Sequence, residues 1–107
     1  MESYNKLVRD FIPNIIQRNG KMCDITTLSE NAYINALEKK LQEETAEYLE
    51  SKSKEEIADI LEVLRAIAVS RGYDWDEIET IRTDKKMAKG GFEKRIFLMT
   101  TFNKNER

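Results

Sequence analysis

Two pairs of carboxylates, each spaced by one helical turn, stand near the middle of the chain. The first pair is Glu44 and Glu47 in EETAE, and the second is Glu56 and Asp59 in EIAD. Residues three apart on a helix share a face, so the two acids of each pair point the same way. Carboxylate oxygens are the ligands that Mg²⁺ and Mn²⁺ prefer. A divalent metal site is therefore the first chemistry that these residues could support.

The first pair lies on the apolar side of its predicted helix. The apolar residues of this stretch follow a 3-4 spacing, which is the pattern of a packed helix face: Ile34, Leu37, Leu41 and Tyr48. Glu44 falls inside this apolar arc, and Glu47 flanks it one turn later. We therefore expect Glu44 to point toward whatever the helix packs on.

The second pair occupies a helix that is apolar on nearly every side. Between residues 57 and 69 only Asp59, Glu62 and Arg65 are polar. A short break at SKSK, residues 51–54, would fold the two helices antiparallel and bring the acid pairs together. Four carboxylates in a partly buried place cannot all stay ionised without a cation, because burial and mutual repulsion both disfavour their charge. The pattern therefore predicts a metal ion between the helices.

Structural explanations exist for each acid alone. Ser53 and Glu56 have the spacing of a capping box, so Glu56 could serve only to begin a helix. Glu43, Glu47 and Glu50 could form a solvated face, and Asp59 could pair with a buried lysine or arginine. Together these explanations would have to account for two inward-facing pairs joined by a short turn.

Four basic residues are candidates for binding phosphate. Lys85 and Lys89 are one turn apart on a third predicted helix, where Lys85 shares a stripe with Ile78 and Ile81. Gly90-Gly91 follows and could let backbone approach a ligand or could cap the helix. Near the start, Lys6 and Arg9 could bind phosphate, although Arg9 could also pair with Asp10. A carboxylate metal site with nearby cations fits a nucleoside polyphosphate.

Composition limits the remaining classes of function. The net charge is −2, so no basic field favours nucleic acid, and no apolar run is long enough to cross a membrane. The absence of histidine removes imidazole acid–base chemistry and most zinc sites. The single cysteine, Cys23, excludes an intrachain disulfide and suits a reducing compartment. With no signal peptide recognised, we expect a cytoplasmic protein.

The elements that position these residues are mostly helices. We expect one domain over 1–107, with a short helix at 13–19, long helices at 29–51 and 54–71, and a further helix at 74–89. Short extended segments are expected near the termini. Residues 5–10 should be extended, residues 21–28 extended or loop, and the β-prone stretch 92–102 a short strand or a docked tail. The fold class is all-α, a helical bundle. Because three helices leave part of the apolar 54–71 helix bare, we expect a homodimer or a higher homo-oligomer to complete it.

Three ordered motifs resemble one protein family. EETAE followed by EIAD resembles the EExxE…ExxD signature of the MazG-like, all-α NTP pyrophosphatases. NKLVRDFIPNII resembles the KLVRDKIPEII signature of one branch of that superfamily, the branch that includes proteins like phosphoribosyl-ATP pyrophosphohydrolase. KGGFEKRI resembles that branch's C-terminal signature. The resemblance covers residues 4 to about 98.

The resemblance implies a Mg²⁺-dependent hydrolase that converts nucleoside triphosphate to monophosphate and pyrophosphate, often to remove noncanonical nucleotides. By motif position, the metal ligands would be Glu44, Glu47, Glu56 and Asp59, with Mn²⁺ as an alternative ion. Glu43 or Glu47 would orient or activate water. The phosphate ligands would be Lys85, Lys89, Lys6 and Arg9.

Two departures and two alternative functions accompany this interpretation. Phe11 and Asn14 replace the lysine and glutamate of the branch signature, which would change specificity if these positions touch substrate. Only eight residues separate Glu47 from Glu56, which shortens the hairpin. The alternative functions are phosphoribosyl-ATP hydrolysis and a non-catalytic helical module for nucleotide binding or dimerisation.

Overall fold

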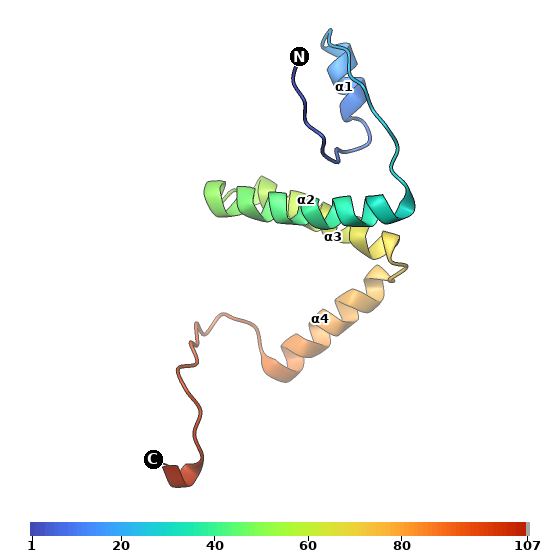
Figure 1. Cartoon of the computed structure of the whole chain (residues 1–107). Helices are drawn as coiled ribbons and strands as arrows, with labels where there is room; N and C mark the ends of the chain where they lie inside the picture. Colours follow the sequence, from blue (N-terminus) through green and yellow to red (C-terminus); the bar gives the residue numbers. More distant parts are fainter. Residues whose placement is uncertain (107) are drawn as a thin grey trace. The chain divides into compact units, whose positions relative to one another are not determined.

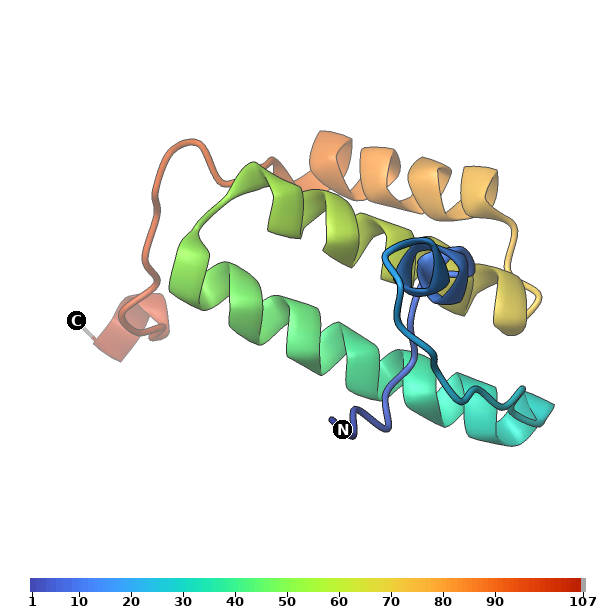
Figure 2. The same cartoon turned by 90° about the horizontal axis from the view of Figure 1, so that it is seen from above.

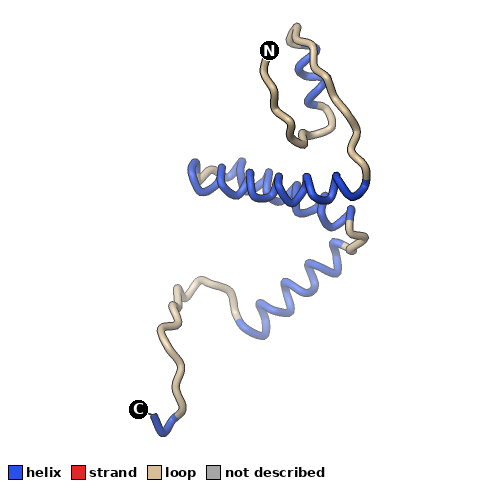
Figure 3. The backbone as a smooth tube through the Cα atoms, in the orientation of Figure 1, coloured by secondary structure: helices blue, strands red, loops and turns tan. Residues whose placement is uncertain are grey.

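Helices are the only regular secondary structure in residues 1–106, which the computed structural model describes. Its helices are α1 (Ile12–Arg18), α2 (Glu30–Ser51), α3 (Lys54–Ser70), α4 (Trp75–Lys89) and a short 3-10 helix, η1 (Lys104–Glu106) (Figure 1). No strand occurs in this part of the chain, so the β-prone stretch 92–102 is loop (Figure 3). The all-α class is therefore confirmed. The chain forms two compact units, Met1–Trp75 and the residues from Asp76 onward, whose relative positions are not determined.

The first unit is built on a helical hairpin formed by α2 and α3. Side-chain caps define where both helices begin: the Ser29 hydroxyl accepts a hydrogen bond from the backbone N–H of Ala32 at 3.3 Å, and the Ser53 hydroxyl accepts one from Glu56 at 3.4 Å. Lys52 ends α2 in the left-handed region, at φ 59°. Only Lys52 and Ser53 connect the helices, which therefore run antiparallel along each other (Figure 2).

The core of this hairpin is small. Its buried apolar residues are Leu37 on α2 with Val63 and Ala68 on α3. At the end of α3, Arg71 forms an ion pair with Glu38 of α2 at 2.6 Å. The guanidinium of Arg65 lies 4.7 Å from the centre of the Trp75 ring, in a cation–π arrangement. The Arg71–Glu38 pair ties α2 and α3 together at the end opposite the turn, and the Arg65–Trp75 contact joins α3 to the chain that follows it.

The chain before α2 begins with a loop and a single short helix. α1 starts at Ile12, one residue before the expected boundary, because the backbone N–H of Ile12 bonds to the carbonyl of Arg9 at 3.1 Å. Pro13 lies in the first turn, where its missing N–H costs nothing. Gly20 follows the helix with φ +85°, a conformation that favours glycine. Before α1, the chain descends toward α2 (Figure 1).

The second unit contains most of α4 and the C-terminal segment. Hydroxyls of Thr80 and Thr83 donate to the carbonyls of Asp76 and Glu79, one turn earlier. Arg82 forms an ion pair with Glu79 at 3.0 Å. α4 contributes no buried residue. Among the described residues, no helix combines the length and hydrophobicity that crossing a membrane requires.

Candidate metal and phosphate site

Five carboxylates gather where α2 and α3 lie side by side. Oxygen atoms of Glu43, Glu44 and Glu47 all lie within 4.8 Å of one another, and so do oxygen atoms of Glu44, Glu56 and Asp59. The first group comes from α2 alone, whereas the second joins both helices. Glu44 belongs to both groups and is therefore the centre of this acidic cluster. The antiparallel turn expected from the sequence does bring the two acid pairs together.

Glu44 is the one charged residue that is buried in the described part of the chain, with 7% of its surface exposed. Its position on the packed side of α2 confirms the helical-wheel prediction. Burial is the main cause that raises the pKa of Glu44, and the neighbouring Glu47 raises it further, while Lys40 acts in the opposite direction. The Oε2 atom of Glu44 is buried without a hydrogen-bond partner. A buried carboxylate oxygen without a partner is costly, so its position calls for a ligand or a proton.

Glu56 contributes a second oxygen of this kind. Ser53 caps α3 through the backbone N–H of Glu56, but the backbone N–H of Ser53 donates to the Ser51 hydroxyl at 3.3 Å. The side chain of Glu56 is therefore not used to close a capping box. Its Oε2 atom is buried without a hydrogen-bond partner. Burial is the main cause that raises the pKa of Glu56; Glu47 acts in the opposite direction, and the charges of Glu44 and Asp59 raise it further.

Glu47 and Asp59 lie at the more open side of the cluster. Glu47 is exposed, although a carboxylate oxygen of its side chain lies close to those of Glu43 and Glu44. Asp59 pairs with Arg9, whose Nη2 lies 2.8 Å from Oδ1 of Asp59. This pair is not buried, since the side chains are 57% and 39% exposed. Arg9 thus pairs with Asp59, rather than with the adjacent Asp10 as the alternative interpretation held.

Two lysines approach the other side of the cluster. The Nζ atom of Lys6 lies 3.4 Å from Oε1 of Glu43, although the two residues are 37 positions apart in the sequence. The Nζ atom of Lys40 lies 3.6 Å from the same oxygen of Glu43 and 3.3 Å from Oε1 of Glu44. Lys40 was not among the residues predicted from the sequence. Its spacing of three and four residues from Glu43 and Glu44 was the available signal, but such pairs are usually surface contacts.

The cluster carries more acids than bases. Three cationic side chains, Lys6, Arg9 and Lys40, face five carboxylates, which leaves a formal charge of −2 when all are ionised. Among the described residues, no lysine or arginine forms an ion pair with Glu47 or Glu56. One divalent cation would balance this charge. The donor set also fits Mg²⁺ or Mn²⁺, because it consists of carboxylate oxygens and includes two buried ones without partners.

The two predicted phosphate ligands of the C-terminal half belong to the second unit. Lys85 and Lys89 lie one turn apart on α4, as expected, and both are exposed. Lys85 was expected to face inward, but within its own unit its side chain is exposed. Because the two units are not placed relative to each other, contact between these lysines and phosphate stays a prediction.

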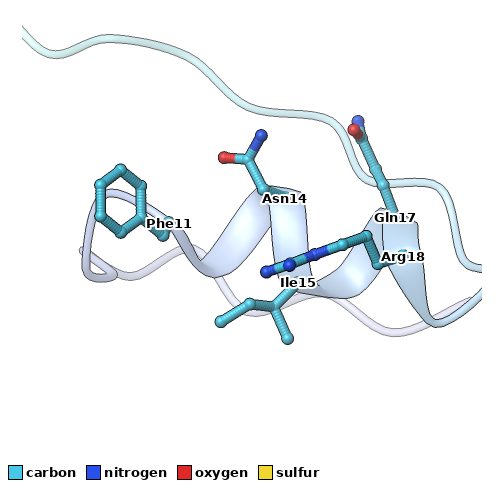
Figure 4. Close-up of a pocket in the computed structure, with 5 residues that line it drawn as sticks. All are labelled: Phe11, Asn14, Ile15, Gln17 and Arg18. Carbon is cyan, nitrogen blue, oxygen red and sulfur yellow. The ribbon is translucent and has the colours of Figure 1, made fainter.

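A separate hollow of about 630 Å³ opens along α1, and none of the acids lines it. Its lining residues are Phe11, Asn14, Ile15, Gln17 and Arg18 (Figure 4). Asn14 and Gln17 project to the same side of the helix in this view, and Phe11 lies at its beginning. Phe11 and Asn14, the two positions that depart from the branch signature, thus line the same hollow. Phe11 follows Arg9 by two residues.

No family model, curated protein or solved structure matches this chain.

Proposed function

We propose that the protein is a Mg²⁺-dependent nucleoside triphosphate pyrophosphohydrolase, which forms nucleoside monophosphate and pyrophosphate. The observation that carries this proposal is the buried Glu44, which shares an acidic cluster with residues of both helices and keeps one oxygen unpartnered. A purely structural hairpin would gain stability from an apolar residue at this place. The resemblance to the MazG-like signature supports the same reaction.

The ligands for Mg²⁺, or for Mn²⁺, would be Glu44, Glu47, Glu56 and Asp59. When bound, the ion would supply charge for the phosphoryl oxygens and lower the pKa of a water molecule. In the reaction, the oxygen of water bonds to one phosphorus of the α–β anhydride. The bridging P–O bond then breaks, and its electron pair leaves with the other phosphoryl group, so that monophosphate and pyrophosphate form. Glu43 or Glu47 would accept the proton of that water.

Cations would hold the triphosphate against the cluster. Lys6 and Arg9 already lie beside its acids in the first unit, which favours them as phosphate ligands. Lys85 and Lys89 remain the predicted ligands from α4. The physiological role would be the removal of noncanonical nucleotides from the cytoplasm.

Two other functions make different predictions. A phosphoribosyl-ATP pyrophosphohydrolase would perform the same bond cleavage on one particular substrate. A non-catalytic module would bind nucleotide or a second chain without turnover. If it were a pure scaffold, it would have no use for the unpartnered oxygens of Glu44 and Glu56.

Self-association completes the proposal. α3 exposes a second apolar stripe at Ile57, Leu61 and Leu64, which are 54%, 49% and 39% exposed. Residues with this spacing of four and three share one helix face. We propose that this stripe packs against a second copy of the chain in a two-fold bundle.

A panel of canonical and modified nucleoside triphosphates, with phosphoribosyl-ATP included, tests the reaction. Phosphate and pyrophosphate should be measured separately, with and without Mg²⁺. We expect the protein to release pyrophosphate from nucleoside triphosphate, and to do so only when Mg²⁺ is present. Orthophosphate without pyrophosphate would contradict the reaction class, and binding without any product would favour the non-catalytic module.

A further inference from the structure

We propose that Lys6 and Lys40 form a binding site for the pyrophosphate part of a nucleotide, and that the Glu43 carboxylate occupies this site as an internal anion. This inference rests on the proposed function, because it names the contacts of the substrate's phosphates at the same cluster. Both ammonium nitrogens lie within 3.6 Å of a single atom, Oε1 of Glu43. Two cations that converge on one oxygen offer the surroundings that a phosphate oxygen requires.

The two lysines reach this atom from separate parts of the chain. Lys40 belongs to α2, and its side chain is only 17% exposed, so its ammonium group is held in place. Lys6 belongs to the loop before α1, and its side chain is 43% exposed. One lysine is therefore fixed and the other is free to adjust to a ligand. This difference suits a site that must accept and release an anion.

The position of Lys40 connects this pair with the predicted metal ligands. Its ammonium nitrogen lies 3.3 Å from Oε1 of Glu44, the residue that both acidic groups share. A polyphosphate that touches a metal at Glu44 would therefore bring its oxygens beside Lys40. The lysines would then exchange the Glu43 carboxylate for a phosphate oxygen.

The exchange has a consequence for Glu43. In this structure its Oε1 atom is engaged by the ammonium groups of Lys6 and Lys40. Once phosphate takes the lysines, the carboxylate is released next to the bound phosphates.

Titration of the Mg²⁺-loaded full chain with inorganic pyrophosphate, followed by calorimetry, tests the inference. Lys40→Gln should weaken pyrophosphate binding by roughly one to two orders of magnitude, the effect of losing one charge-assisted hydrogen bond. Lys40→Arg should keep part of the affinity. The matched control is Lys39→Gln, because Lys39 is exposed and forms no ion pair with the cluster. This control should bind as the wild type does.

The melting temperature and the Mg²⁺ affinity without pyrophosphate separate loss of the ligand contact from loss of the fold. Mg²⁺ affinity should stay the same or increase in Lys40→Gln, because this lysine competes for Glu44. If Lys40 were only a structural counter-ion, its loss would lower the melting temperature and leave pyrophosphate affinity unchanged. Should Lys40→Gln fail to fold, Lys6→Gln is the second variant. Lys6 lies in an exposed loop outside the helices, and its loss should also weaken pyrophosphate binding.

Two results would overturn the inference: a wild type that does not bind pyrophosphate, or lysine variants that bind it as the wild type does. Failure of the proposed reaction is a different result. A wild type that binds pyrophosphate through Lys40 but hydrolyses no nucleotide would keep the site and remove the reaction. Hydrolysis with unchanged KM and pyrophosphate affinity in Lys40→Gln would keep the reaction and remove the site.

Discussion

Arg9 and Asp59 are fifty positions apart in the chain, yet Nη2 of Arg9 lies 2.8 Å from Oδ1 of Asp59. The guanidinium therefore covers a predicted metal ligand. Both side chains are more than one-third exposed, so the pair contributes little to stability, about 0–1 kcal/mol. Its main effect would be competition: the guanidinium of Arg9 on the Asp59 carboxylate opposes the approach of a metal ion to the same carboxylate.

The first prediction follows from this competition. Arg9→Gln should strengthen Mg²⁺ binding without nucleotide by roughly 1.5- to 5-fold, the effect of losing a competing ion pair of 0.2–1 kcal/mol. It should weaken nucleotide binding, since Arg9 is a predicted phosphate ligand. Calorimetry with each ligand measures both effects. The control is Arg18→Gln, an exposed arginine that forms no ion pair in the described residues. Weaker Mg²⁺ binding in Arg9→Gln would contradict competition.

The second prediction concerns the ligand itself. Asp59→Asn should weaken Mg²⁺ and Mn²⁺ binding by more than about tenfold, because even the loss of an indirect metal contact commonly costs ~10–100-fold. Circular dichroism should show the wild-type helix content, since Asp59 lies at the open side of the cluster. The exposed Glu50→Gln on α2 serves as a charge-matched control. Metal affinity equal to that of the wild type would remove Asp59 from the site.

The third prediction concerns pH. Burial raises the pKa of Glu44 in the folded chain above its value in the unfolded chain. Such a group stabilises the fold fully below the unfolded pKa, and this stability is lost as the pH rises through the folded pKa. Without metal, Glu44→Gln should therefore melt at a higher temperature than the wild type near pH 7. The two should converge toward about pH 4, near the ordinary pKa of glutamate.

Thermal melts from about pH 4 to 8 measure this difference, which should amount to several degrees. A change of 1 kcal/mol corresponds to ~4–8 °C in a small domain. Glu50→Gln should follow the wild type at every pH. A difference between Glu44→Gln and the wild type that shrinks as pH rises would show that the folded chain favours the charged form of Glu44.

The fourth prediction separates two roles for Lys85. If it binds phosphate, Lys85→Ala should raise KM or lower kcat by roughly one to two orders of magnitude, as expected for a lost charge-assisted contact of ~1.5–3 kcal/mol. Mg²⁺ affinity without nucleotide should hardly change. The adjacent Lys86, which lies 3.9 Å from Glu93, provides the control. If Lys85 were a structural counter-ion to the acids, its loss would lower the melting temperature and strengthen Mg²⁺ binding.

The fifth prediction concerns assembly. A charge on the apolar stripe of α3, as in Leu61→Glu, should convert the proposed dimer to a monomer, because a buried unpaired carboxylate is costly. Light scattering at micromolar concentration measures the mass. Glu62→Lys changes the charge beside the stripe and should leave the dimer intact. A wild-type monomer in the same measurement would remove the proposed interface.

Much of the hairpin could be predicted because its signals are local. Ser29 and Ser53 stand before their helices and cap them as their residue type predicts. The inward position of Glu44 followed from the spacing of its apolar neighbours. The contacts of Lys6 and Arg9 could not be found in this way, because they depend on how a loop meets a hairpin far along the chain.

Other parts of the site were missed for physical reasons. Lys40 had the spacing of an ordinary surface ion pair, and only the burial of its side chain sets it apart. The stretch 92–102 has residues with high β propensity, but a strand needs a partner strand, and the described chain provides none. Phe11 and Asn14 were noted as departures, whereas the hollow that they share required the structure.

The two-residue turn between α2 and α3 makes the acidic cluster sensitive to chain length. One inserted residue would shift the start of α3 relative to the end of α2, and the meeting of Glu56 and Asp59 with Glu44 depends on that placement. Surface loops usually tolerate insertions and deletions. Here, however, the connection positions two helices that both contribute carboxylates to the acidic cluster. Lys52, at φ 59°, should accept glycine, which favours this backbone conformation, at the cost of the contact between its ammonium group and the Tyr48 ring at 5.7 Å. In evolution, this turn would therefore vary in composition while its length is held constant.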